Sequence, residues 1–328
     1  MLTRTIDYYR SETKETIVSA CRLFGVNRQV YYRRKKMVQT KQERAFRVLS
    51  LVQAVRSLMP RIGTRKLYYL LEQELNELSV GRDQLFDILR ANHLLIKPNR
   101  SYRTTTNSYH RFHKHKDLIT GIVPQKPEQI WVSDITYIGN RDNHQYLALV
   151  TDAYSKKIVG YDLSSSLSSD GALRALKMGI KKRSYTNNTL IHHSDRGLQY
   201  CCDDYQDLLA KKKILCSMTE SYDPYANAVA ERVNGILKLE FQLENYNIRL
   251  SLMKQLVENS IHIYNNIRPH YSCYLKTPEQ MHRQSEIDIR TYKKTEPFKA
   301  SLERFCLMIY FCPIICIAYL GLDIILII

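Results

Sequence analysis

Apolar residues near the start of the chain recur at the spacing of helices. Between residues 12 and 36 they predict two short helices around a turn, in which Gly25 ends the first helix and Asn27 caps the second. The second helix, from Arg28 to Lys36, carries basic and aromatic side chains together. This order is typical of a helix-turn-helix, and a small helical hairpin fits the same pattern.

The helical spacing continues from residue 42 to residue 95. One apolar face ends at Pro60, a new helix begins near Gly63, and residues 79–95 are expected to form a further pair of helices. A second helix-turn-helix and a plain three-helix bundle both fit. Residues 96–127 are rich in basic and small polar residues and poor in apolar ones, which predicts a mobile basic linker.

From Gln129 onward the pattern changes to alternating strands and helices. The expected strands are 131–138, 146–152, 157–163, 189–193 and 214–218, and the expected helices are 168–182, 205–212, 226–243 and 250–266. Asp142-Asn143-His144 is expected to turn the chain between the first two strands. The order predicts an α/β fold, a ribonuclease-H-like mixed sheet flanked by helices, preceded by an all-α helix-turn-helix region.

The charge is unevenly distributed along the chain. The sequence has 49 Lys and Arg against 32 Asp and Glu, a net of +17. Residues 1–130 hold 25 basic and 11 acidic residues, a net of +14, whereas residues 131–328 hold 24 and 21, a net of +3. A basic region beside a near-neutral one predicts a polyanion-binding part attached to a separate working domain, with a merely soluble basic surface as the alternative.

Basic side chains on the first helices are the candidates for contact with double-stranded DNA, because Lys and Arg neutralise phosphates and release counterions. The residues expected to make this contact are Arg28, Arg33, Arg34, Lys35, Lys36 and Arg65. The eight cysteines form no C-x-x-C pair and the N-terminus has no signal-like segment, so we expect reduced thiols and a cytoplasmic protein.

Three acidic residues stand out from their surroundings. Asp134 lies in the middle of a predicted strand, where Asp is rare. Asp195 follows another strand at its C-terminal end, and Glu231 lies on the first turns of a long helix after a gap of 35 residues. Any one of them alone is most simply a surface acid or a cap. The three together predict a catalytic site that binds metal.

Carboxylates suit such a site because Mg²⁺ prefers a few carboxylate oxygens together with water and phosphate oxygens. Two ions about 3.5–4 Å apart can hold the attacking and leaving oxygens of an in-line displacement. Asp134, on a rigid strand, is the candidate to bridge both ions. Asp195 and Glu231 would each hold mainly one.

Residues 131–278 closely resemble the integrase core of bacterial insertion-sequence transposases, the group related to retroviral integrases. The matching segments are WVSDITYI, YLALVTDAYSKKIVGY, HHSDRGLQY, NAVAERVNGILKLEF and YNNIRPHYSCYLKTPEQ. The resemblance extends over about residues 12–285. It implies a DDE site made by Asp134, Asp195 and Glu231, using two Mg²⁺ ions for which Mn²⁺ can substitute.

The resemblance also implies the activity and its partners. The expected function is cleavage at the ends of a mobile element followed by strand transfer, on terminal inverted repeats and target DNA. Proteins of this group act as multimers and often draw their first helices from an upstream reading frame, so a homo-multimer and an upstream-frame protein are expected partners. The expected domains are a DNA-binding region (1–95), a basic linker (96–127), an integrase catalytic core (128–285) and a C-terminal extension (286–328).

Four further residues have expected roles around the three acids. The resemblance implies that Lys238, seven residues past the glutamate and roughly on the same helix face, contacts the terminal DNA. His193 is expected to orient Asp195 or to meet DNA, and Gly197 to permit a tight turn. Asn227 is expected to support the site from the third motif.

The last 24 residues, 305–328, are almost entirely apolar, with Asp323 as the only charge. They are long enough to span a bilayer, and Lys and Arg precede them. Three interpretations remain open: a membrane anchor, a segment that packs into a partner, and foreign sequence added at the end of the element. We favour the third, so a membrane is the least expected partner.

Two other classes of function remain as alternatives. The chain could be a catalytically inactive DNA-binding remnant that regulates transposition. The unusual tail favours this alternative. A hydrolase of RNA–DNA hybrids shares the expected fold, but it would not need the basic N-terminal helices.

Overall fold

A computed structural model describes residues 2–97, 115–140, 144–219 and 228–283. It divides into two compact units, the helical unit (Met1–Ala54 with Leu67–Leu95) and the catalytic unit (Val55–Lys66 with Ile96–Ile328). The segment Val55–Lys66 therefore belongs with the catalytic unit, although the sequence pattern groups it with the helices. The predicted tail and most of the predicted linker lie outside the described residues, as does the turn at Asp142-Asn143.

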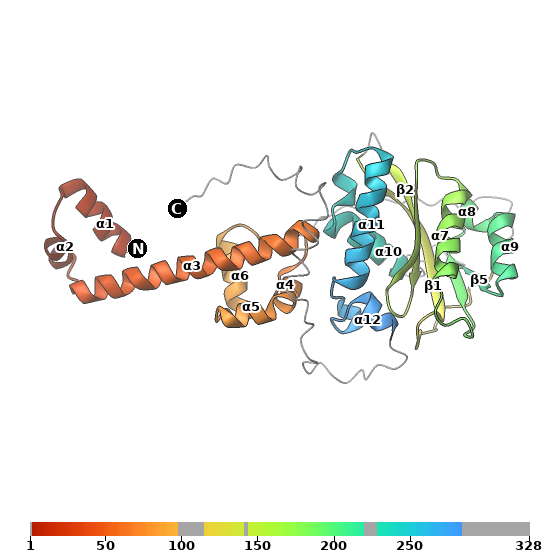
Figure 1. The fold of residues 1–328 in the computed structure, drawn as a ribbon, viewed down its shortest axis with the longest axis horizontal. Coiled ribbons are helices and arrows are strands. Elements are labelled where there is room, and N and C mark those ends of the chain that lie inside the picture. Colours follow the sequence, from red (N-terminus) through yellow and green to blue (C-terminus); the bar gives the residue numbers. More distant parts are fainter. Residues whose placement is uncertain (1, 98–114, 141–143, 220–227, 284–328) are drawn as a thin grey trace. The chain divides into compact units, whose positions relative to one another are not determined.

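The helical unit begins with α1 (Leu2–Thr13), α2 (Ile17–Leu23) and α3 (Arg28–Leu58) (Figure 1). The predicted turn signals are confirmed, because Gly25 has a φ of 63° and the Asn27 side chain accepts a hydrogen bond from the Gln29 N–H at 2.8 Å. Ile6, Ala20, Cys21 and Tyr31 form the core. The prediction of two short helices was wrong for α3, which runs for 31 residues because no Gly or Pro interrupts it.

The remaining helices of this region are short. They are α4 (Thr64–Leu70), α5 (Glu72–Glu77) and α6 (Arg82–Ala91). In α6, Leu85 and Leu89 lie one turn apart on the same face and are fully buried. The expected pair of helices in residues 79–95 was wrong, since this stretch has room for a single helix after the Gly81 N-cap.

The catalytic unit is built on a five-stranded mixed sheet. Its strands are β1 (Ile130–Ile138), β2 (Gln145–Asp152), β3 (Ile158–Ser164), β4 (Ile191–Ser194) and β5 (Leu215–Met218). Their order is β3-β2-β1-β4-β5, with β1, β2 and β3 antiparallel and β4 and β5 parallel to β1. The predicted strands are thereby confirmed to within two residues, and the sheet has the ribonuclease-H-like arrangement.

Helices cover both faces of this sheet (Figure 1). One face carries α7 (Ser169–Lys181), α8 (Leu198–Cys201) and α9 (Asp203–Lys211), which bury a core that includes Trp131, Leu176 and Tyr205. The sheet approaches α7 closely at Gly160, where a Cβ would stand 2.0 Å from the Ala175 carbonyl oxygen. Only glycine fits there.

The other face carries the C-terminal helices α10 (Ala228–Gly235) and α11 (Leu250–Asn266), followed by α12 (Pro278–His282). The predicted helix at 250–266 is confirmed. The predicted long helix at 226–243 was wrong: α10 passes into a π-helical turn at Ile236–Glu240 and then a 3-10 turn at Leu243–Asn245. A π turn bonds i to i+5, so it changes which residues share a face.

The end of the predicted linker is attached to the edge of the sheet. The Leu118 N–H donates to the Ser217 hydroxyl at 2.8 Å, and the Met218 N–H donates to the Lys116 carbonyl at 3.3 Å. These contacts hold residues 116–118 against β5. Within the part of the chain that the structure describes, no helix is both long and apolar enough to cross a bilayer.

Candidate active site

Asp134 lies in the middle of β1, and the alternation of the strand decides where it faces. Its side chain projects to the same side as Val132, which packs with Ala230 of α10. One carboxylate oxygen, Oδ1, accepts from the Ile135 N–H at 2.9 Å, and Oδ2 accepts from the Asn234 side chain at 2.6 Å. The carboxylate is thus held between its own strand and α10.

Asp195 is brought beside Asp134 by the pairing of two parallel strands. Ser133 of β1 lies opposite Ser194, the last residue of β4, and an aspartate follows each of them along the chain. The Asp195 carboxylate accepts from the Gly197 N–H at 3.1 Å.

Gly197 follows Asp195 where the chain turns into α8. Its φ of −67° is open to any residue, so the backbone conformation alone does not require glycine. A Cβ at this position would instead stand 3.0 Å from Asp195 Oδ1 and 3.1 Å from the Gln199 side-chain oxygen. The glycine allows the backbone N–H to approach the carboxylate closely.

Glu231 lies in the first turn of α10 and is exposed. Partial burial raises the pKa of its carboxyl. Asn234 follows three residues later on α10 and donates its side-chain N–H to Asp134. Our sequence interpretation missed Asn234, although its i, i+3 spacing from Glu231 puts both on one side of the helix and could have indicated it.

The electrostatics of the site connect the three acids. Burial raises the pKa of Asp134 to about 7, the charge of Asp195 adds to this effect, and the charge of Glu231 contributes less. The hydrogen bonds from Ile135 and Asn234 act in the opposite direction. Asp134 is therefore a partly buried carboxylate beside like charges, and a cation would stabilise its ionised form.

The side chains around Asp134 fit a hard cation and its water ligands. Carboxylate oxygens are the ligands Mg²⁺ prefers. Asn234 Oδ1 and the Tyr200 hydroxyl are buried with no hydrogen-bond partner among the described residues. In the same residues, no group of three or more His, Cys, Asp or Glu side chains stands at metal-holding spacing. The structure thus brings Asp134 and Asp195 together, with Glu231 acting on Asp134 through its charge.

Two residues, His193 and Asn227, were expected to support the site, and the structure describes only the first of them. His193 is fully buried, and its Nδ1 is hydrogen-bonded to the Ser217 hydroxyl at 2.9 Å. It joins β4 to β5, so the expectation that it meets DNA was wrong. Asn227 lies outside the described residues.

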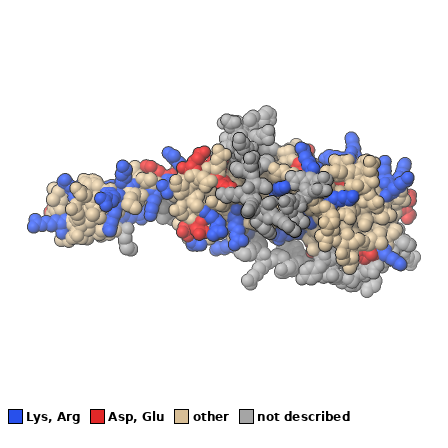
Figure 2. Space-filling model, turned by 90° about the horizontal axis from the view of Figure 1, so that it is seen from below, with Lys and Arg blue, Asp and Glu red and all other residues tan. Residues whose placement is uncertain are grey.

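The basic residues expected to contact DNA lie mainly in solvent. Arg28, Arg33, Arg34, Lys36 and Arg65 are exposed. Figure 2 shows Lys and Arg projecting along the N-terminal helices on the face that it presents.

Two of the expected DNA contacts have surroundings that the sequence pattern did not indicate. Lys35 is exposed but paired with Asp7 of α1, 3.2 Å from its carboxylate. Lys238 is half-buried in the π turn, so the argument that it shares a regular helix face with Glu231 was wrong.

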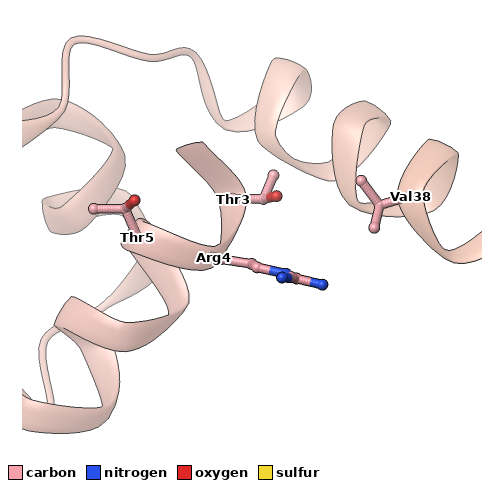
Figure 3. Close-up of a pocket in the computed structure, with 4 residues that line it drawn as sticks. All are labelled: Thr3, Arg4, Thr5 and Val38. Atoms are coloured by element: carbon pink, nitrogen blue, oxygen red, sulfur yellow. The ribbon is translucent and has the colours of Figure 1, made fainter. Parts of the chain in front are cut away.

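A hollow of about 410 Å³ lies in the helical unit, away from the acidic residues in the sequence. It is lined by Thr3, Arg4 and Thr5 of α1 and Val38 of α3 (Figure 3). None of these side chains is an acid, so the hollow is not a candidate for metal binding.

Comparison with known proteins identifies relatives over most of the chain. Residues 124–224 and 212–278 match two models of an integrase core domain. A 31 kDa protein of insertion element IS600 from Shigella sonnei is 32% identical over 257 residues, which cover 76% of this chain and 92% of that protein. The transposase InsF of insertion sequence IS3fB from Escherichia coli K12 is 31% identical over 199 residues, 60% of this chain and 69% of InsF.

Among solved structures, the catalytic core of HTLV-2 integrase in complex with magnesium is 19% identical, with a TM-score of 0.38, covering 48% of this chain and 97% of that one. The sequence relatives and the domain matches together place the function of the family in DNA transposition. The chain belongs to the insertion-sequence transposases that have an integrase core domain.

Proposed function

We propose that this chain cuts DNA at the ends of a mobile element and joins the exposed 3′ ends to target DNA, in a metal-dependent reaction at Asp134, Asp195 and Glu231. The observation that carries the proposal is that Asp134 and Asp195 directly follow Ser133 and Ser194, which pair across the adjacent parallel strands β1 and β4, with the pKa of Asp134 raised by burial and by the neighbouring charges. A site that accumulates negative charge in this way favours a cation.

The three acids divide the binding of metal between them. Two Mg²⁺ ions, for which Mn²⁺ can substitute, would supply positive charge to the attacking and leaving oxygens at phosphorus. Asp134 would contact both ions, held in place by Asn234. Asp195 and Glu231 would each hold one, with the Gly197 N–H orienting Asp195. Cleavage and joining are both in-line displacements at phosphorus, so one site can serve both.

DNA would be bound by the exposed cations of the helical unit. Arg33, Arg34 and Lys36 lie on the exposed part of α3 and would contact phosphates on the terminal inverted repeats or the target. Lys238 follows Glu231 along the chain and would contact the terminal DNA of the cut strand. The family's multimeric action and an upstream-frame protein are part of the same proposal.

The test is the joining of a duplex that carries the element's ends, in the presence of Mg²⁺. Asp134→Asn should lower the rate of both cleavage and joining by on the order of 10³-fold, the scale seen when a group acting on developing charge is lost. Asp204→Asn is the matched control, because it makes the same change at an exposed position on α9. We expect it to join ends like the unaltered protein.

The outcome separates the proposal from its alternatives. If Asp134→Asn joined ends as well as the Asp204→Asn control, the site assignment would be wrong. If the unaltered protein bound the ends but neither cut nor joined them, the chain would be a DNA-binding remnant instead. Circular dichroism of both variants checks that each is folded.

A further inference from the structure

Tyr200 places a buried hydroxyl without a hydrogen-bond partner near the acidic residues. It belongs to α8, the short helix that begins three residues after Asp195, and its N–H donates to the Gly197 carbonyl at 3.0 Å. The residue is only 3% exposed, and its hydroxyl has no partner among the described residues. A buried donor without a partner destabilises a folded protein.

Aromatic neighbours hold the Tyr200 ring in position. The ring meets Tyr205 edge-on, with centroids 5.4 Å apart, and lies 6.4 Å from the His192 ring. Tyr205 differs in one respect: its hydroxyl is hydrogen-bonded to His192 at 2.9 Å. The two neighbouring tyrosines of this core therefore differ: the Tyr205 hydroxyl has a hydrogen-bond partner among the described residues, and the Tyr200 hydroxyl has none.

The backbone of Tyr200 lies one turn from Gly197, whose N–H donates to the Asp195 carboxylate at 3.1 Å. Burial raises the pKa of the Tyr200 hydroxyl well above the ordinary value, and the charges of Asp134 and Asp195 add to this effect. The two oxygens of Asp134 already accept bonds from Ile135 and Asn234, but a carboxylate has about four acceptor positions. A hydroxyl that does not reach a carboxylate directly can do so through one water.

We infer that Tyr200 is a positioning residue of the metal site, whose hydroxyl donates a hydrogen bond through one water to the Asp134–Asp195 pair when metal is bound. The inference rests on the proposed function, because it takes these carboxylates as the metal ligands. Its physical basis is the role of partners behind the ligands, which orient carboxylates and raise metal affinity.

The experiment measures Mn²⁺ affinity of the full chain without DNA, by water-proton relaxation, together with the metal-free melting temperature. Tyr200→Phe removes only the hydroxyl. We expect Mn²⁺ binding to weaken by about 10-fold, the lower end of the range for residues behind a ligand. The metal-free melting temperature should stay the same or rise, because an unpaired buried donor is lost.

Tyr205→Phe is the matched control, since it makes the same change on the adjacent ring. It removes a hydroxyl that is hydrogen-bonded to His192, so it should lower the metal-free melting temperature and leave Mn²⁺ affinity unchanged. A purely structural role for Tyr200 would give the pattern of Tyr205→Phe, and would overturn the inference. Unchanged Mn²⁺ binding in Tyr200→Phe, or failure of this variant to fold, would overturn it as well.

A third variant keeps the two proposals distinguishable. Asp134→Asn should lose Mn²⁺ binding if the acids are the metal ligands. Loss in Asp134→Asn with no change in Tyr200→Phe would reject the role of Tyr200 alone. Unchanged binding in Asp134→Asn would reject the proposed metal site, and the inference with it.

Discussion

The helical unit and the catalytic unit treat charge in opposite ways. In the helical unit, residues 32–43 of α3 are all exposed, so their cations lie in solvent. In the catalytic unit, Glu128 and Glu240 are drawn into the interior, and each is matched by cations there: Arg183 contacts Glu128, and Arg268 contacts Glu240. Solvent stabilises the first set of charges, and ion pairs stabilise the second.

Asp134 differs from Glu128 and Glu240, because its charged neighbours are acids and not cations. It is held in place by hydrogen bonds from Ile135 and Asn234, and its nearest charged influences are the acids Asp195 and Glu231. An acid that is partly withdrawn from solvent beside other acids is costly unless a cation enters. The comparison therefore separates charges that hold the fold from charges that, under the proposed function, are left for a partner: phosphate for the exposed cations of α3, and metal for the acids.

The largest effect should come from breaking the ion pairs of Glu240. This carboxylate accepts two bonds from the Arg268 guanidinium, at 2.9 and 2.7 Å, and lies 3.2 Å from the Lys66 ammonium. The Arg268 side chain is only 2% exposed. Glu240→Gln should lower the free energy of unfolding of the catalytic unit by about 3–5 kcal/mol, because it leaves buried cations without a counter-charge.

Urea unfolding followed by tryptophan fluorescence measures this change in the right unit, because the single tryptophan, Trp131, is buried in the core of the catalytic unit. Arg283→Gln is the control, since it removes an ion pair to Glu279 through a side chain that is 76% exposed. It should change stability by less than about 1 kcal/mol. Equal shifts for the two variants would contradict the distinction between interior and surface pairs.

The next effect depends on pH and concerns the cluster around His282 of α12. His282 lies 3.5 Å from Glu128 and 3.8 Å from Asp152, and is hydrogen-bonded to the Ser155 hydroxyl at 3.0 Å. Burial alone would lower the pKa of His282, but the bonds to Asp152 and Glu128 outweigh it, so the pKa is raised. Burial alone would raise the pKa of Glu128, but hydrogen bonds from His282, Ser184 and Tyr185 outweigh it, so the pKa is lowered.

The direction of each shift gives the pH window. The contribution of His282 is complete below its ordinary pKa of about 6.5 and is lost as the pH rises through the higher folded value. That of Glu128 is complete above its ordinary pKa of about 4.3 and is lost as the pH falls through the lower folded value. The cluster therefore stabilises the fold most between these two values.

His282→Gln should accordingly lower the melting temperature more at about pH 5.5 than at about pH 8.5. His262→Gln, at an exposed position on α11, is the control and should show no such difference. A deficit for His282→Gln that grew as the pH rose would mean that the histidine is neutral in the cluster.

The contrast between the units also explains what could be predicted from the sequence. β1 was predictable because its apolar run is local, and Asp134 was conspicuous because it interrupts that run. The expectation that Asp134 and Asp195 share a site came from the resemblance and from the position of Asp195 at the end of a strand, because the sequence pattern gives no order of strands within the sheet. The sequence pattern gave no sign of the His282–Glu128 contact, since these residues are far apart in the chain and meet only through the fold.

Other features of the fold and the site could not be predicted from the sequence, for different reasons. The π turn at Ile236–Glu240 lies in a run that reads as continuous helix, because a π turn has no strong composition signal. In the sequence, Gly197 resembles an ordinary turn glycine. Its close approach to the Asp195 carboxylate becomes visible only when the position of that carboxylate is known. The bond between Tyr205 and His192 required the packing of α9 against the sheet.

The smallest expected effect tests whether every cation of α3 is available to DNA. Lys35 is paired with Asp7, whose carboxylate also accepts a hydrogen bond from the Tyr31 hydroxyl. These contacts join α1 to α3, and they leave Lys35 exposed but already paired with an acid. Lys35→Ala should therefore weaken binding of a random-sequence duplex less than Arg34→Ala, and should reduce the slope of log affinity against log salt by less than about 1.

Asp7→Asn is the converse change and decides the question. It removes one negative charge beside the basic part of α3 and leaves Lys35 without its ion pair, so affinity should rise slightly and the salt slope should steepen by up to about 1. Since Asp7 also accepts the bond from Tyr31, a melting curve must show that α1 still packs on α3. Weaker binding by a folded Asp7→Asn protein would mean that the ion pair positions α3 for DNA, and that Lys35 belongs with the charges that hold the fold.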